Sequence, residues 1–355
     1  MRPIELAPNQ PRQFYRGGHT LSEFRGTPAL DDYRPEDWLA STTARHGAGG
    51  DDGLTRLSDG ELLRDAVLRD PVAWLGAEHA ATIGDDTALL VKLLDAAERL
   101  PVHVHPDRAF ARSHLGCRSG KTEAWVVIDA AGGSQMHLGF RRDVDPEQLN
   151  RWMATQDATA LLASLHALDV RAGDAILVPA GLPHAIGAGV FCLELQEPTD
   201  FSVMLEWADF PTLDATQARL GLSATAAREC VRTKAVAASE LSHLRREALE
   251  RSEGIERVFP EEADGYFRAE RIRANGRALT LDPGFAVLVT LGGDGAITTA
   301  AGDALELRRG STTLIPHGAG ALTLSGTLEA VRCRPPTPTA AQATGLITGA
   351  EGDAR

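Results

Sequence analysis

One short alternating stretch constrains the fold more than any other part of the chain. Residues 102–105 read Val-His-Val-His, and in a β-strand residues i and i+2 point to the same face, so His103 and His105 share one side. Glu123 follows, and His184 comes after a Gly/Pro turn at residues 179–183. Three histidines and one carboxylate suit a divalent transition metal. If all four bind one ion, segments far apart in the chain must lie side by side.

The alternative interpretation of His103 and His105 is a pair of polar residues on a solvated strand face. The matching context of Glu123 and His184 favours the metal site. The remaining histidines have no such context, and we interpret them as structural or exposed: His19, His46, His79, His114, His137, His166, His243 and His317.

The surrounding pattern is mainly β with helical insertions. Residues 88–94 form an apolar run that predicts a buried strand, interrupted only by Lys92. We expect a metal-binding catalytic domain over 1–210, with apolar residues at helical spacing in inserts at about 51–84 and 143–168. The remaining expected segments are a helical linker over 211–260, a second β domain over 261–335 and a mobile tail over 336–355.

Composition excludes several classes of function. The formal net charge of −13 argues against nucleic acid and anionic membranes, because both require dense Lys and Arg. No apolar run approaches the ~20 residues of a membrane span, and the start of the chain lacks the apolar region of a signal peptide. The four cysteines have no CxxC spacing, which favours free thiols in a reducing cytoplasm. A monomer is the default expectation.

Several blocks of the sequence resemble class I mannose-6-phosphate isomerases, a family of the cupin superfamily. The resemblance extends, more thinly towards the end, to about Pro335. It implies a bicupin, in which two double-stranded β-helix (jelly-roll) barrels carry helical insertions. The second barrel, which lacks His-x-His and a matching Glu, is expected to be degenerate and to hold no metal. The matching blocks are residues 14–18, 24–26, 36–38 with Ser41, 89–96, 102–107, 120–125, 179–189 and 196–200.

The resemblance also bears on the metal. The family binds zinc and has Gln where this chain has His103, so the site here is closer to that of an ordinary cupin with three His and one Glu. Zn(II) is the first expectation, and Fe(II) or Mn(II) also suits these ligands. The predicted ligands are His103, His105, Glu123 and His184.

Three residues are candidates for the chemistry. Lys121 lies two residues before Glu123, so in a strand it shares the metal face and could act as a base or proton shuttle; the alternative is a surface lysine. A lysine in a buried strand must find a partner or reach water, so Lys92 is either salt-bridged or enters the active cavity. The resemblance favours the cavity for Lys92 and implies a role for Asp200.

Substrate contacts are expected from the strand at 191–196. Glu194 and Gln196 share one face and could line the same cavity, or that face could be solvated.

The chain departs from the family at Met204. The family has an active-site arginine four residues after the aspartate that matches Asp200, and a neutral thioether replaces it here. Other arginines could compensate, with Arg16, Arg108, Arg112 and Arg118 as candidates.

Three functions follow. The first is a metal-dependent aldose–ketose isomerase that interconverts mannose 6-phosphate and fructose 6-phosphate through an enediol. The second is the same chemistry on an unphosphorylated or unusual sugar. The third is a cupin without isomerase activity, either an oxygenase or a sugar-binding sensor. The expected partner is a small-molecule sugar or sugar phosphate.

Overall fold

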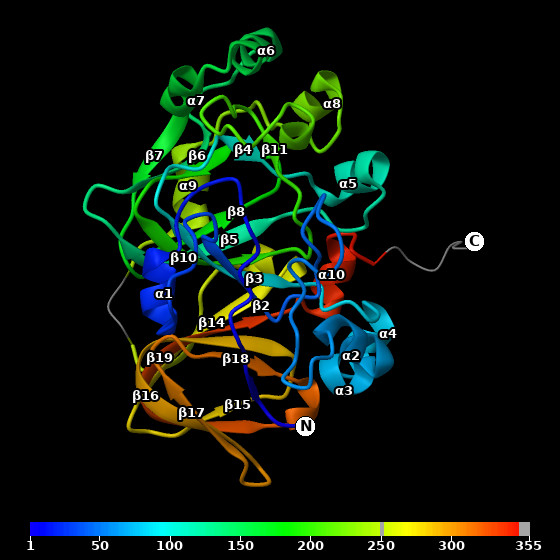
Figure 1. Cartoon of the computed structure of the whole chain (residues 1–355), viewed down its shortest axis with the longest axis vertical. Helices are drawn as coiled ribbons and strands as arrows, with labels where there is room; N and C mark the ends of the chain where they lie inside the picture. Colours follow the sequence, from blue (N-terminus) through cyan, green and yellow to red (C-terminus); the bar gives the residue numbers. More distant parts are fainter. Residues whose placement is uncertain (249–251, 348–355) are drawn as a thin grey trace, which may run out of the picture.

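Three antiparallel sheets account for most of the molecule, which is a computed structural model describing residues 1–248 and 252–347. Figure 1 shows two of them in the upper part of the molecule and the third below. In spatial order the six-stranded sheet consists of β12 (Arg245–Arg246), β8 (Ala175–Val178), β5 (Glu123–Ala130), β10 (Val190–Gln196), β3 (Leu90–Ala96) and β2 (Glu36–Leu39). The five-stranded sheet consists of β11 (Val203–Met204), β4 (His103–Val104), β9 (His184–Ile186), β6 (Gln135–Phe140) and β7 (Leu165–Asp169).

These two sheets form the first barrel, and its interior holds both apolar and charged side chains. Every residue of β3 and β10 is buried. The predicted buried strand at 88–94 is therefore confirmed, with β3 beginning at Leu90. A strand covered on both faces must be apolar unless its polar groups find partners. Lys92 of β3 lies opposite Glu194 of β10, so two charged residues of neighbouring strands meet inside the barrel.

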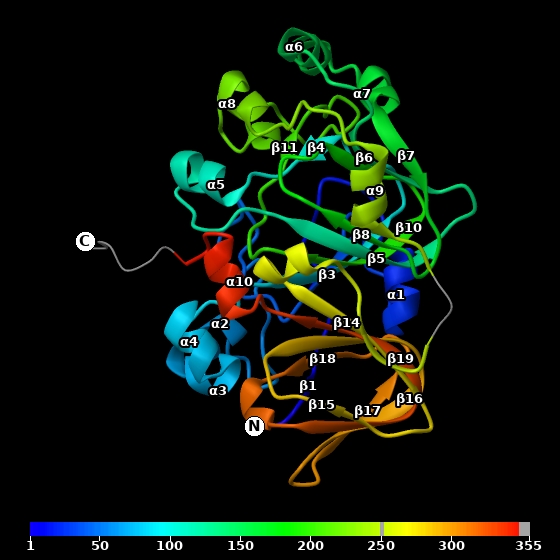
Figure 2. The same cartoon turned by 180° about the vertical axis from the view of Figure 1, so that it is seen from behind.

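The lower sheet forms the second barrel (Figure 2). Its first strand comes from the N-terminus, and Ile4 pairs with Leu314, so the expected 1–210 unit gives one strand to the other half. The main path of this sheet is β1 (Ile4–Glu5), β18 (Thr312–Ile315), β16 (Ala286–Thr299), β19 (Leu322–Arg334), β14 (Arg268–Asn275) and β13 (Gly254–Arg257). Off this path, β15 (Leu279–Leu281) pairs with β19 and β17 (Ala304–Arg308) pairs with β16. One cluster of buried side chains includes residues of both barrels, such as Trp125 and Val331, so the barrels pack against each other.

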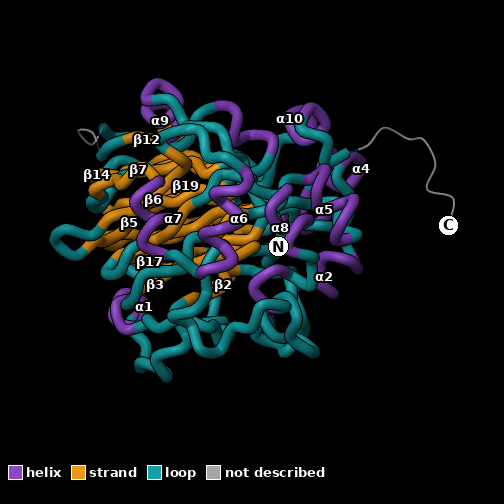
Figure 3. Tube along the Cα trace, turned by 90° about the horizontal axis from the view of Figure 1, so that it is seen from above, coloured by secondary structure: helices purple, strands orange, loops and turns teal. Residues whose placement is uncertain are grey.

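Short helices cover the flanks of this β framework, and the view in Figure 3 shows them as purple coils around the orange strands. The mainly β, cupin-type architecture with helical insertions agrees with the predicted fold class. The helices are α1 (His19–Arg25), α2 (Leu63–Arg69), α3 (Pro71–Leu75), α4 (Ala77–Thr82), α5 (Arg108–Leu115), α6 (Pro146–Thr155), α7 (Ala158–Ser164), α8 (Ala224–Glu229), α9 (Ala238–Leu244) and α10 (Pro338–Ala343).

The expected helical linker over 211–260 is wrong in character. Among the described residues of this range there are only two short α-helices and one 3-10 turn (Gln217–Arg219), and the others are irregular or extended. β12 pairs with β8 and β13 with β14, so tertiary pairing overrides the helical propensity of this Ala- and Glu-rich stretch. Residues 249–251 lie outside the described residues.

The expected mobile tail over 336–355 is wrong for its first part. α10 occupies Pro338–Ala343, Ala341 is fully buried and Leu346 is 5% exposed. Arg112 Nη1 donates to the carbonyl of Gly345 at 2.9 Å, and Arg108 Nη1 bonds to Thr344. These contacts dock the segment on the first barrel. Residues 348–355 lie outside the described residues.

Two further observations concern the whole described chain. The four cysteines are free thiols, and three of them are buried. Within residues 1–248 and 252–347, no helix combines the length and apolar composition needed to span a membrane.

Candidate metal centre and active-site cavity

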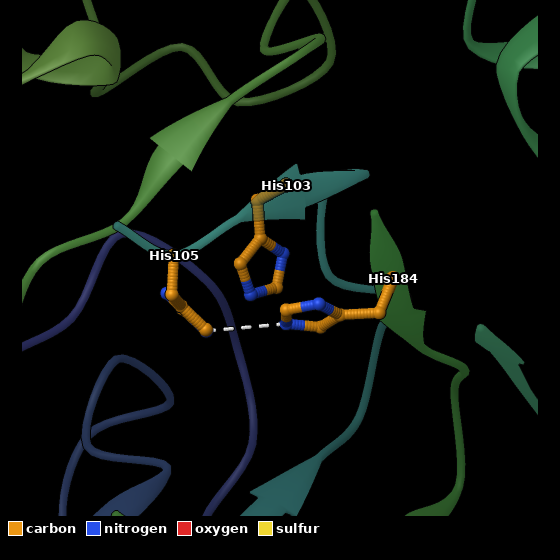
Figure 4. A group of neighbouring side chains, drawn as sticks. All are labelled: His103, His105 and His184. Atoms are coloured by element: carbon orange, nitrogen blue, oxygen red, sulfur yellow. Dashed lines mark hydrogen bonds between the residues drawn. The ribbon is translucent and has the colours of Figure 1, made fainter. Parts of the chain in front are cut away.

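Strand pairing in the five-stranded sheet brings three histidines together. His103 of β4 lies directly opposite His184 of β9, and the N–H of Gly181 donates to the carbonyl of His105 at 2.8 Å. Their potential ligand atoms all lie within 4.8 Å of one another (Figure 4). All three side chains are buried, at 0–6% exposure. The alternative of a solvated strand face for His103 and His105 is therefore excluded.

The backbone fixes the tautomer of each imidazole. His103 Nδ1 lies 2.8 Å from the carbonyl oxygen of Pro101, His105 Nδ1 2.7 Å from that of Phe201, and His184 Nδ1 2.8 Å from that of Leu182. A carbonyl only accepts, so each Nδ1 carries a proton, and in a neutral imidazole Nε2 then presents its lone pair. Such outer hydrogen bonds orient histidines that ligate metals.

The three imidazoles face one another, and burial disfavours the charged form of two of them. Burial lowers the pKa of His103 well below its ordinary value, and burial lowers the pKa of His105 to about 3. The Nε2 atoms of His105 and His184 lie 3.1 Å apart, so two lone pairs point at a shared space. A cation between them would relieve this repulsion.

Glu123 completes the donor set from the six-stranded sheet. Its Oε2 lies 3.0 Å from His105 Nε2 and its Oε1 3.3 Å from His184 Nε2. Burial alone would raise the pKa of Glu123, but His105, Lys121 and His184 lower it, so the group is a carboxylate. Its buried Oε2 accepts no hydrogen bond of good geometry. Three imidazoles whose Nε2 atoms face a shared space, together with one carboxylate, fit a divalent metal ion.

A cavity of about 800 Å³ opens beside this centre. Side chains from both sheets line it, including His103, Lys121, Glu123 and Glu194. A cavity of this size is within the range of small-molecule sites.

Lys92 lies in the wall of this cavity as a compensated cation. Its Nζ lies 3.3 Å from Glu36 Oε2, 3.6 Å from Asp200 Oδ1 and 3.9 Å from Glu194 Oε2. The ring of Trp38 lies 4.6 Å away. Burial alone would lower the pKa of Lys92, but Glu36, Glu194 and Asp200 raise it, so the ammonium stays protonated. Lys92 is therefore salt-bridged and also lines the cavity, so the two alternatives predicted from the sequence are both correct.

Lys121 lies at the metal end of the same cavity. Its Nζ is 2.9 Å from Glu123 Oε2, 3.1 Å from His105 Nε2 and 3.7 Å from Glu194 Oε1. The side chain is 6% exposed, which excludes a surface lysine.

The two acidic candidates also face the cavity. Burial raises the pKa of Glu194, Glu123 reinforces the effect, and Lys121 and Lys92 oppose it. Burial likewise raises the pKa of Asp200, and its Oδ2 accepts the N–H of His46 at 3.2 Å. Both carboxyl groups are therefore easier to protonate than an exposed acid.

Gln196 occupies a different environment. It is fully buried, its Nε2 donates to the carbonyl of Thr199, and it is not among the residues that line the cavity. A direct sugar contact by Gln196 does not fit this placement, because its amide supports the turn before Asp200.

Sequence reasoning did not assign a role to Tyr15 and Glu36 of the cavity wall, or to Trp38, which bonds to Glu36. Tyr15 Oη donates to Glu36 Oε1 at 2.7 Å, and Trp38 Nε1 donates to Glu36 Oε2 at 2.6 Å. Glu36 is therefore a carboxylate held against Lys92. The sequence did contain an indication of their importance, since Glu36 and Trp38 belong to one of the blocks that resemble the family.

Met204 lines the cavity, but the four arginines considered as replacements do not. Arg16 pairs with Glu98, Arg108 with Glu197 and Arg118 with Asp86, while Arg112 bonds to Gly345. None of the four is among the described residues of the cavity wall. The expectation that one of them fills the space beside Met204 is wrong.

The fold and this centre define a bicupin with a candidate metal site in its first barrel. Comparison with known proteins then gives a consistent picture, although no family model matches the chain. A mannose-6-phosphate isomerase of Streptococcus mutans is 40% identical over 134 residues, which is 37% of this chain and 41% of that protein. The mannose-6-phosphate isomerase ManA of Bacillus subtilis is 28% identical over 70% of this chain and 75% of its own length. The putative mannose-6-phosphate isomerase YvyI of the same organism is 28% identical over 92% and 96%.

Solved structures agree on the fold. The crystal structure of the Bacillus subtilis mannose 6-phosphate isomerase superimposes with a TM-score of 0.72 at 22% identity, covering 94% of this chain and all of that one. The apo enzyme from Salmonella typhimurium superimposes with a TM-score of 0.71 at 16% identity, covering 95% and 100%. The chain therefore has the fold of these isomerases along nearly its whole length.

Proposed function

We propose that the protein is a metal-dependent aldose–ketose isomerase that interconverts mannose 6-phosphate and fructose 6-phosphate. One observation supports this above all: three buried imidazoles and a carboxylate converge at the head of a cavity that two lysines and two further glutamates also line. The names of the similar proteins support the same reaction and substrate pair.

His103, His105, Glu123 and His184 would hold the ion. Zn(II) is our first choice, and Fe(II) or Mn(II) suits the same donors. When bound, a divalent cation stabilises the negative charge that develops on neighbouring sugar oxygens.

The reaction moves a proton between C2 and C1 of the open-chain sugar, through an enediol. We propose Lys121 as the group that carries this proton, because it lies at the metal end of the cavity. Glu194 is a second candidate, 3.7 Å from Lys121, because its raised pKa makes its carboxylate a stronger base than an exposed one. Whichever group removes the proton from C2 returns it to C1.

Lys92 and Asp200 would act by position and charge. Lys92 stays protonated, so it can donate to a sugar oxygen but cannot act as a base. Asp200 and Glu36 both form ion pairs with Lys92, and Asp200 also accepts a hydrogen bond from the N–H of His46. Asp200 therefore connects Lys92 to the loop that carries His46.

The direct test is turnover. Purified protein loaded with Zn(II), Fe(II) or Mn(II) is expected to convert mannose 6-phosphate to fructose 6-phosphate, and EDTA is expected to abolish the activity until metal is restored. Elemental analysis would identify the ion, and sedimentation would test the proposed monomer. Absence of turnover in every metal-loaded form would reject this substrate pair, and a preference for free aldoses would favour an isomerase of unphosphorylated sugars.

A further inference from the structure

Two basic residues that line the cavity have no role in the proposed proton transfer. Four residues with fixed basic side chains line the cavity, namely Arg12, Arg45, Lys92 and Lys121. Lys92 and Lys121 each lie within 4 Å of two or more carboxylates that face the cavity or the metal centre. The two arginines instead pair with Asp31 and Asp52, which are not among the described lining residues. The arginines therefore present charge to the cavity that its own acids do not neutralise.

Arg45 is the better placed of the two. Its side chain is 31% exposed, whereas that of Arg12 is 56% exposed. Arg45 Nε donates to Asp52 Oδ2 at 2.6 Å, and within the described residues its two Nη atoms have no hydrogen-bond partner. A guanidinium held through Nε keeps its terminal nitrogens for an oxyanion with two or more oxygens.

The loop that carries Arg45 is anchored to the reaction cavity. The N–H of Arg45 donates to the carbonyl of Asp52 at 2.9 Å, and the N–H of His46 donates to Asp200. Gly53 has φ of +88°, and a Cβ built there would lie 2.7 Å from the ring of Trp38, the same ring that Lys92 approaches. The loop therefore packs against a ring that also contacts Lys92 of the cavity wall, and these contacts hold Arg45 in place.

The wall around Met204 offers no comparable charge. β11, which carries Met204, contacts the 3-10 turn at Gln217–Arg219, and the lining residues of that segment, Leu213, Gln217 and Leu220, are neutral. A dianionic group placed against this wall would lose solvation without gaining a cation.

We propose that Arg45 binds the phosphate group of the sugar phosphate, and that Asp52 positions its guanidinium for this contact. The inference rests on the proposed function, because it concerns how the same cavity recognises a phosphorylated sugar. Arg45 is then a specificity-determining residue, and the metal and Lys121 act at the opposite end of the sugar.

The test compares Arg45→Ala, Arg45→Lys and Arg56→Ala in the metal-loaded protein. Arg56 is a matched control because it pairs with Asp51 on the same stretch, is 55% exposed and does not line the cavity. Losing charge-assisted hydrogen bonds is expected to lower kcat/KM for mannose 6-phosphate by about 10- to 100-fold in Arg45→Ala. The inhibition constant of inorganic phosphate is expected to rise by a similar factor. Arg45→Lys should recover part of both values, and Arg56→Ala neither loses activity nor changes phosphate inhibition.

Two results would overturn the assignment. An unchanged phosphate inhibition constant in Arg45→Ala would show that the anion binds elsewhere, and equal losses for mannose 6-phosphate and free mannose would show a structural role. If the wild-type protein turns over neither sugar, the proposed function fails, and calorimetric titration with inorganic phosphate still tests Arg45. Weaker phosphate binding in Arg45→Ala than in wild type would then support an anion site in a protein of another activity.

Discussion

Both barrels are built from antiparallel strands, but the side chains that fill their interiors differ. In the first, charged side chains of β3, β5 and β10 meet histidines of β4 and β9. In the second, the interior cluster is apolar, with Leu288, Ile297, Leu307, Ile315 and Leu324 among its members. The second barrel thus resembles an ordinary core, whereas the first gives up apolar burial for a site. A single architecture therefore accommodates either stability or chemistry, depending on which residues alternate inward.

Removing a proposed metal ligand is the strongest test of this difference between the two barrels. His105→Ala is expected to lower kcat/KM by roughly 10⁴-fold or more, since the ion supplies several kcal/mol of charge stabilisation. Metal content measured alongside kinetics should fall in parallel. His317→Ala, at the similar Pro-His turn of the second barrel, is the control, and a loss of metal in that variant would contradict the distinction between the barrels.

The choice between Lys121 and Glu194 can be made by following hydrogen exchange. Replacing the residue that abstracts the proton is expected to lower kcat by roughly 10³-fold. Lys121→Ala and Glu194→Gln should be compared for uptake of solvent deuterium at C2 of the substrate, with metal content as control. The variant that loses exchange while retaining metal identifies the base. If both variants retain exchange, neither residue is the base.

Substitutions in the two interiors should lower the free energy of unfolding by similar amounts but for different physical reasons. Lys92→Met leaves Glu36, Asp200 and Glu194 buried without their common cation, which is expected to cost about 3–5 kcal/mol at neutral pH. Leu324→Ala in the second barrel should cost about 2–5 kcal/mol by creating a cavity. Chemical denaturation measures both.

The pH dependence separates these two variants. Lowering the pH protonates the carboxyl groups that Lys92→Met leaves unpaired, so part of its loss should be recovered in acid, whereas that of Leu324→Ala should not. Identical pH profiles would contradict the idea that the first barrel is stabilised by compensated charge.

The same contrast explains what could be predicted from sequence. Residues of regular strands, such as His103, Lys92 and Glu194, follow a period of two, so their faces were predictable, and the cupin-type fold was confirmed. The prediction of a helical linker over 211–260 was wrong, because strand pairing of Arg245 and Arg246 overrides the local helical propensity. Arg45 was missed because it lies on an irregular loop, where no periodicity relates a residue to the cavity. The order of residues 338–346 depends on Arg108 and Arg112, which the sequence does not connect to that segment.

The smallest expected effect concerns a charge cluster of the second barrel, in which the exposed Asp282 pairs with the buried Arg332 and Arg334. Burial alone would raise the pKa of Asp282, but hydrogen bonds from Arg334 and Arg332 lower it to about 2. A depressed pKa contributes stability above the unfolded value of about 3.9, and this contribution is lost as the pH falls through about 2. Because the Asp282 side chain is 59% exposed, solvent screening limits the contribution to about 1 kcal/mol. Asp282→Asn should therefore destabilise slightly at pH 7 and converge with wild type near pH 2, and a loss comparable to that of Lys92→Met would show that the second barrel also depends on its charges.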